Sequence, residues 1–168
     1  ARRIAVLIAV LAAGLAITEM AEKGAQNAYL THHIQAADDW AFYQAKTIRA
    51  NIYTNQAEML AALAAGRDAA GAAALDKQAA AARATAARLN DDPKGGEGRA
   101  QVMARAKASE AQRDVVFHRY HLFEGVVGAL QIAIVLASVS VVTRVSALAL
   151  GAGVLGLAAG VFAGLVAA

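Results

Sequence analysis

The chain is 168 residues long, and 58% of its residues are hydrophobic while only 5% are aromatic. Cysteine is absent, which excludes disulfide bonds and thiolate metal sites, and proline occurs only once. This composition is typical of a helical protein that has more apolar surface than a water-soluble domain carries.

The net charge of +3 comes from the flanks of the apolar segments. Between Thr18 and Phe123 the sequence has 13 Lys and Arg residues and 12 Asp and Glu residues, so the excess lies in Arg2, Arg3 and Arg144. Because no basic face recurs along a helix, we expect no nucleic-acid partner. Basic residues beside apolar segments instead indicate a membrane, so lipids are the expected immediate partners.

The first apolar segment, Ile4 to Ile17, is shorter than the roughly 20 residues that a hydrocarbon core requires. Thr18 to Ala21 can extend it, so we expect residues 1–22 to form transmembrane helix 1. A secretory signal is the alternative interpretation of this segment.

Residues 23–123 are predicted to form helices outside the membrane. The first of these helices runs from about Ala25 to Ala65 and carries apolar residues along one side. We call this side the aliphatic stripe; it comprises Leu30, Ile34, Ala37, Ala41, Ala45, Ile48, Ile52, Met59 and Leu63. Trp40 and Tyr43 lie outside the stripe, and we interpret them as helix-packing residues because a helix with two apolar sides usually has two neighbours.

A second helix is predicted over the alanine-rich tract Ala72 to Leu89, and the proline and glycines of residues 90–98 predict a loop. The third helix starts near Arg99 and continues into the membrane. Its seam alternates between spacings of four and three, as in a coiled coil, and comprises Val102, Ala106, Ser109, Arg113, Val116, Tyr120 and Phe123. The resulting helical hairpin would form a coiled-coil-like stalk or a compact bundle, and Gly24 is where either could bend.

Residues 124–143 and 144–168 are the predicted second and third spans. Only a short turn separates them, so Arg144 must lie on the same side of the membrane as the N-terminus. The positive-inside rule makes that side the cytoplasm. We therefore expect a bacterial inner-membrane protein with a cytoplasmic N-terminus and periplasmic extramembrane helices.

Small residues recur at every fourth position of the third span. Gly156, Gly160 and Gly164 form the centre of this row. In lipid, small residues let helix backbones approach closely, so these glycines are predicted helix-packing residues.

Four polar residues are candidates for a metal site. Asp114, His118 and His121 follow one another on one side of the third helix, and the hairpin would bring His32 near them. Acids and bases spaced in this way on a wet helix face are more often solvated or paired. We therefore expect no resident metal and no other cofactor.

Aromatic and basic side chains gather just before the second span. We interpret Phe117, Arg119, Tyr120 and Phe123 as membrane-interface anchors. The sequence has no P-loop, nucleophile elbow, zinc-protease motif or dinucleotide-binding turn, so we do not expect an enzyme.

Three motifs occur in order between a leading apolar segment and a trailing glycine-rich one. They are DDWAFYQAKTIR (Asp38 to Arg49), AQRDVVFHRYHLFEG (Ala111 to Gly125) and LQIAIVLASVSVVT (Leu130 to Thr143). With them, nearly the whole chain resembles a bacterial family of membrane proteins, the domain of unknown function 4337 family. The resemblance implies an integral membrane protein of unknown activity and brings no site residues with it.

The sequence thus predicts an all-α protein with three transmembrane helices and a long helical hairpin between the first and second. Surfaces for association are more abundant than catalytic groups. We therefore expect a structural or accessory membrane subunit, acting as a homo-oligomer or within a larger membrane complex. Two alternatives stay open: a passive pore or channel component formed by oligomerised spans, and a metal-binding protein that uses His118 and His121.

Overall fold

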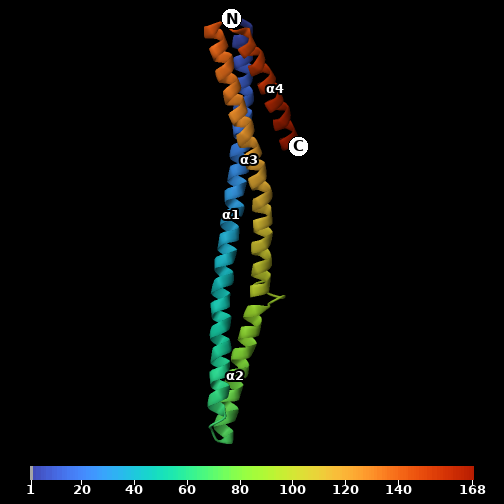
Figure 1. Cartoon of the computed structure of the whole chain (residues 1–168). Helices are drawn as coiled ribbons and strands as arrows, with labels where there is room; N and C mark the ends of the chain where they lie inside the picture. Colours follow the sequence, from blue (N-terminus) through green and yellow to red (C-terminus); the bar gives the residue numbers. More distant parts are fainter. Residues whose placement is uncertain (1) are drawn as a thin grey trace. The chain divides into compact units, whose positions relative to one another are not determined.

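The computed structural model describes residues 2–168, and the structural statements below concern this part of the chain. Four helices make up 91% of it, and no strand occurs among these residues. The helices are α1 (Arg2–Ala64), α2 (Ala69–Asn90), α3 (Arg99–Thr143) and α4 (Ser146–Ala167) (Figure 1). The all-α prediction is confirmed.

Three helices, α1, α3 and α4, are long and apolar enough to cross a membrane, judged by length and composition. Their most apolar windows have mean hydropathies of 2.3, 2.3 and 2.1. Only 11% of the α1 window and 17% of the α4 window are buried inside the protein, so most of these apolar side chains face outward. Outward-facing apolar side chains are stable when the surrounding solvent is lipid, and the three helices fit a membrane protein.

The helix ends agree with the predicted breaks in most places. Helix α1 continues through Gly24, the position at which the sequence allows a bend, and one glycine costs a helix only about 1 kcal/mol relative to alanine. The turn before α2 closes at Asp68, whose carboxylate accepts a hydrogen bond of 3.0 Å from the Gly71 amide. This N-cap starts α2 at Ala69, three residues before the predicted Ala72.

The described chain forms two compact units, and α1 and α3 each contribute to both. We call residues 2–31 and 112–168 the apolar unit, and His32–Ala111 the alanine-rich unit.

In the apolar unit, α1, α3 and α4 pack around a core of aliphatic and alanine side chains. Its buried members are Leu11, Val126, Leu130, Ala133 and Ala159. The N-terminus of α1 lies at the same end of this unit as the turn between α3 and α4 (Figure 1). The three arginines that flank the spans therefore gather at one end.

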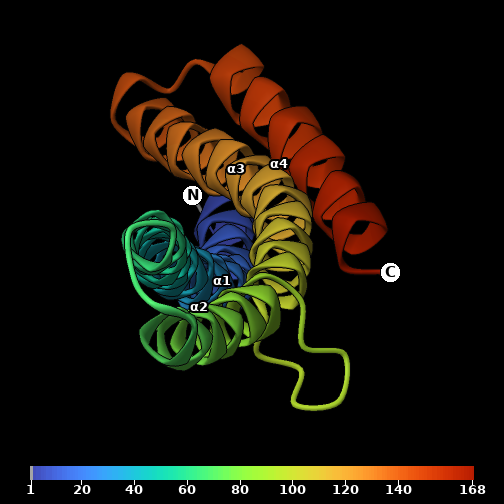
Figure 2. The ribbon, with the colours of Figure 1, turned by 90° about the horizontal axis from the view of Figure 1, so that it is seen from below.

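In the alanine-rich unit, α2 and the first turns of α3 pack against α1, and α2 lies alongside α1 in both views (Figures 1 and 2). The buried positions of α1 follow a seven-residue spacing and are mostly alanine: Ala36, Ala50, Ala57 and Ala64. Those of α2 are also alanines, namely Ala79, Ala82 and Ala86. A seven-residue repeat of small side chains is a coiled-coil seam that lets helices approach closely.

The predicted seam of α3 is confirmed by its burial. None of its seven residues is exposed, and Val102 and Ala106 are completely buried. The aliphatic stripe of α1 behaves differently, because its large side chains do not form the core of the alanine-rich unit. The alanine seam takes that place on the other side of the helix.

Candidate functional site

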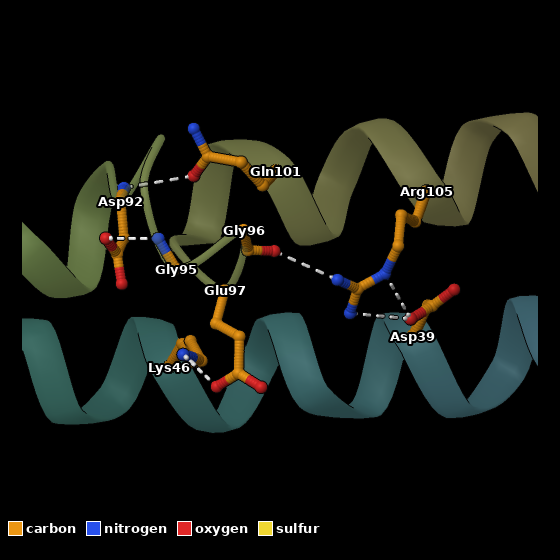
Figure 3. A network of polar contacts seen from close by, with 8 residues as sticks. All are labelled: Asp39, Lys46, Asp92, Gly95, Gly96, Glu97, Gln101 and Arg105. Carbon is orange, nitrogen blue, oxygen red and sulfur yellow. Dashed lines mark hydrogen bonds and ion pairs between the residues drawn. The ribbon is translucent and has the colours of Figure 1, made fainter.

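The motif Asp38 to Arg49 lies on α1 where the loop at residues 91–98 and the start of α3 contact it (Figure 3). The guanidinium of Arg105 connects the two helices. Its Nη1 donates a hydrogen bond of 3.0 Å to the Gly96 carbonyl oxygen, and its Nη2 lies 3.3 Å from Oδ1 of Asp39. One side chain of α3 thus binds both the loop and α1.

A second connection joins Lys46 to the same loop. Its ammonium lies 3.6 Å from Oε2 of Glu97 and 4.8 Å from the centre of the Phe42 ring. Lys46 is buried although it is charged, so the carboxylate and the aromatic face replace part of its hydration. Figure 3 shows that Lys46 and Arg105 both reach the loop, at Glu97 and at Gly96.

The predicted packing residues Trp40 and Tyr43 also face α3. The indole Nε1 of Trp40 donates a hydrogen bond of 3.1 Å to Oε1 of Glu110, and the rings of Trp40 and Tyr43 meet edge to face at 5.4 Å. The guanidinium of Arg99 lies 5.8 Å from the centre of the Tyr43 ring. The polar and aromatic residues of this motif therefore fix the register between α1 and α3, and they form no nucleophile–base pair.

The loop is also held by its own residues. Oδ1 of Asp92 accepts a hydrogen bond of 3.0 Å from the Gly95 amide, and Oε1 of Gln101 accepts one of 3.1 Å from the Asp92 amide (Figure 3). Gly96 has a positive φ of 68°, and a side chain at Gly98 would collide with the backbone of Asp92. The loop therefore needs glycine at both positions.

On the opposite side of α1, the aliphatic stripe leaves large side chains in contact with solvent. Ile34, Ile48, Ile52, Met59 and Leu63 of the alanine-rich unit are between 52% and 65% exposed. Single exposed aliphatic residues are common on protein surfaces, but a continuous row of them indicates an interaction surface. This stripe is the candidate site for association.

The metal candidates have other partners or belong to different units. Asp114 binds the guanidinium of Arg113 at 2.8 Å, and Nδ1 of His121 lies 2.8 Å from Oε2 of Glu124. His32 belongs to the alanine-rich unit, and its Nδ1 is buried without a hydrogen-bond partner. Across residues 2–168, no three His, Cys, Asp or Glu side chains form a group that could hold a metal ion.

Two of the predicted interface residues, Phe117 and Tyr120, belong to an aromatic cluster of the apolar unit. The ring of Phe117 lies 5.1 Å from that of Tyr29 and 4.2 Å from that of His121. The carboxylate of Glu124, with smaller effects from burial and Glu22, raises the pKa of the Tyr120 phenol above its ordinary value. The phenol therefore stays protonated and neutral at physiological pH.

Phe123 and Arg119 have other surroundings than the aromatic cluster. Phe123 is buried in the apolar unit, with 4% of its surface exposed. Arg119 is exposed, and its Nη2 donates a hydrogen bond of 2.9 Å to the Ala167 carbonyl oxygen near the end of α4.

The predicted glycine row divides into two parts. Gly156 lies against Leu11 of α1, and a Cβ atom there would collide with the leucine side chain. Gly160 and Gly164 have open space around them and line a cavity of about 450 Å³ in the apolar unit. Sequence reasoning did not find this cavity; the glycines of α4 and Gly14 of α1 were its only signal.

Comparison with family models matches the whole chain, residues 1–168, to the family described as a domain of unknown function (DUF4337). The chain belongs to this family, and the resemblance seen in its motifs is confirmed. No curated protein and no solved structure matched the chain.

Proposed function

We propose that this protein is a structural or accessory membrane subunit that associates with a second copy of itself through the aliphatic stripe. The observation that carries the proposal is the inverted packing of α1. Its buried seam in the alanine-rich unit consists mostly of alanine, while its larger aliphatic side chains face solvent.

The energetics favour burial of the stripe against a partner. Completing the burial of a half-exposed Ile, Leu or Met side chain contributes on the order of 1 kcal/mol. Several such side chains in one row form an apolar surface whose burial against a partner is favourable. The stripe carries no charge, so a copy of itself meets no like-charge repulsion when two stripes face each other, and the contact can be twofold symmetric.

Membrane insertion supports self-association further. Copies inserted with the same topology run parallel, so two stripes that face each other across a twofold axis along the membrane normal bring each stripe residue opposite its own counterpart. We place the protein in a bacterial inner membrane, with Arg2, Arg3 and Arg144 on the cytoplasmic side and the alanine-rich unit in the periplasm.

The test is the mass of the protein after gentle extraction, measured by light scattering during size-exclusion chromatography. We expect the wild type to elute at a multiple of 17.2 kDa. A double variant, Ile48→Asn with Ile52→Asn, should shift it toward the single-chain mass because it places unpaired amides in the contact.

Val115→Asn is the matched control, because Val115 is 72% exposed but belongs to α3 and is not a residue of the stripe. It should leave the mass unchanged. A wild type that elutes as a stable monomer would contradict the proposal, and co-elution with other subunits at a fixed ratio would assign the stripe to a larger complex instead.

A further inference from the structure

We infer that the cavity of the apolar unit binds one acyl chain of a phospholipid whose phosphate lies at Arg119. This site is separate from the aliphatic stripe, and the inference does not depend on the proposed self-association. It rests on the shape of the cavity, on the chemistry of its lining and on the position of one arginine.

The cavity exists because α4 diverges from α1 after their close contact. Gly156 touches Leu11, but toward the C-terminus of α4 the two helices separate (Figure 1). A Cβ atom at Gly160 or Gly164 would have no neighbour within 4 Å. The result is a groove between the two helices with Phe123 and Leu130 of α3 on its wall.

The lining is apolar. Helix α1 contributes mainly leucine, valine and isoleucine, and α4 contributes glycine, alanine and leucine. Thr18 is the one lining residue with a polar side chain, and its hydroxyl already donates a hydrogen bond of 2.8 Å to the Gly14 carbonyl oxygen. Water would find no side-chain partner here, whereas a hydrocarbon chain needs none.

The dimensions of the groove fit a single acyl chain better than a helix. Its residues on α1 run from Leu7 to Ala21, which is about 21 Å along the helix axis. One leaflet of a bilayer has a hydrocarbon depth of about 15 Å, so an acyl chain fits along this length. A helix about 10 Å wide could cover the open side of the groove but could not enter it, whereas a single acyl chain is narrow enough to lie inside.

The groove leads to a charged group. A second cavity of about 290 Å³ shares Ala21, Phe123 and Ala167 with it and is also lined by Arg119. The guanidinium uses one nitrogen to bind the Ala167 carbonyl oxygen, and further N–H groups remain available. Arginine binds phosphate through paired hydrogen bonds, so a phospholipid with its chain in the groove would have its head group at this guanidinium.

The test uses nanodiscs of phosphatidylethanolamine and phosphatidylglycerol that contain a phosphatidylglycerol with a photoreactive diazirine on its acyl chain. After illumination, mass spectrometry locates the adducts. We expect them to concentrate on Leu7, Ile17 and Leu157 in the groove. Leu150 and Leu165, which are exposed on α4 outside the groove, should receive fewer.

Gly160→Leu should abolish the groove adducts, because its side chain enters the open space without a clash at Cβ and occupies the path of the acyl chain. Gly151→Leu is the matched control: it adds the same side chain to α4 where there is also open space, but outside the groove. It should keep the adducts. Arg119→Gln should weaken the retention of phosphatidylglycerol during purification.

Three results would overturn the inference or part of it. Equal labelling of groove and outward residues, unchanged by Gly160→Leu, would show only the ordinary lipid around a membrane protein. Loss of a dimer in Gly160→Leu without any change in lipid would show that the groove receives a helix of a second copy. An Arg119→Gln variant that retains the lipid unchanged would overturn the assignment of the head group.

Discussion

Ser140 and Arg144 close the tight turn between α3 and α4. The Ser140 hydroxyl is buried and donates a hydrogen bond of 2.9 Å to the Val145 carbonyl oxygen. Arg144 has a positive φ of 58°, a left-handed conformation that costs a residue with a side chain about 1 to 2 kcal/mol. An arginine occupies this position although its backbone conformation is unfavourable, which fits a role of its charge at the membrane edge.

We predict that Ser140→Ala destabilises the apolar unit by about 1 kcal/mol, because it removes the hydrogen bond of a buried hydroxyl to the Val145 carbonyl oxygen, which keeps the Leu148 amide as its other donor. Ser138→Ala is the control, since the Ser138 hydroxyl is exposed and only binds a carbonyl of its own helix. Denaturation in detergent, followed by circular dichroism, measures both. Equal stability of the two variants would show that the hydrogen bond to Val145 contributes nothing.

Arg105 is the other residue on which much local structure depends, since it binds both Gly96 and Asp39. We predict that Arg105→Ala loosens the loop at residues 91–98 and costs about 1 kcal/mol, because the ion pair is partly exposed. Faster amide hydrogen exchange in the loop would show this. Lys107→Ala removes an exposed cation from the same helix and should leave the hydrogen exchange of the loop unchanged. If the loop also exchanges faster in the Lys107→Ala variant, the effect of Arg105→Ala would be a general effect of charge.

The helices show which of their contacts can be predicted from sequence patterns and which cannot. The α3 seam was predicted because it begins with a valine and two small residues at coiled-coil spacing among polar neighbours. The alanine seam of α1 was not predicted, because alanines occur on every side of that helix and the buried side does not differ from the others in sequence. The Asp39–Arg105 and Trp40–Glu110 contacts depend on the register between α1 and α3. The groove depends on the divergence of α4 from α1. Neither the register nor the divergence is encoded by a local sequence pattern.

We predict that Ala57→Leu destabilises the alanine-rich unit by about 1 to 3 kcal/mol, because Ala57 is 1% exposed and the added atoms would push neighbouring helices apart. Ala62→Leu, at an exposed position of the same helix, should have little effect. Thermal unfolding compares the two. If they unfold alike, the small-residue seam is not a close helix contact.

For the chain as a whole, the spans and their flanking charges determine the expected orientation. The structure places the N-terminus and the turn at Arg144 at one end of the apolar unit, and the proposed topology requires both to lie on one side of the membrane (Figure 1). Because the chain has no cysteine, single introduced thiols report the orientation without background.

We predict that Lys94→Cys, in the exposed loop between α2 and α3, reacts with a membrane-impermeant maleimide added to intact cells of the host bacterium whose outer membrane has been permeabilised. Thr143→Cys, at the other end of α3, should react only after the inner membrane is opened. The reverse pattern would place the alanine-rich unit in the cytoplasm.

We propose that the aliphatic stripe is a contact between two copies, and cysteine cross-linking in native membranes can detect that contact. Under mild oxidation, Ile52→Cys should form a disulfide-linked dimer at twice 17.2 kDa, whereas Val115→Cys should not. This result would place two stripes side by side in the membrane. A monomer for Ile52→Cys, or equal dimer from both variants, would contradict the claim.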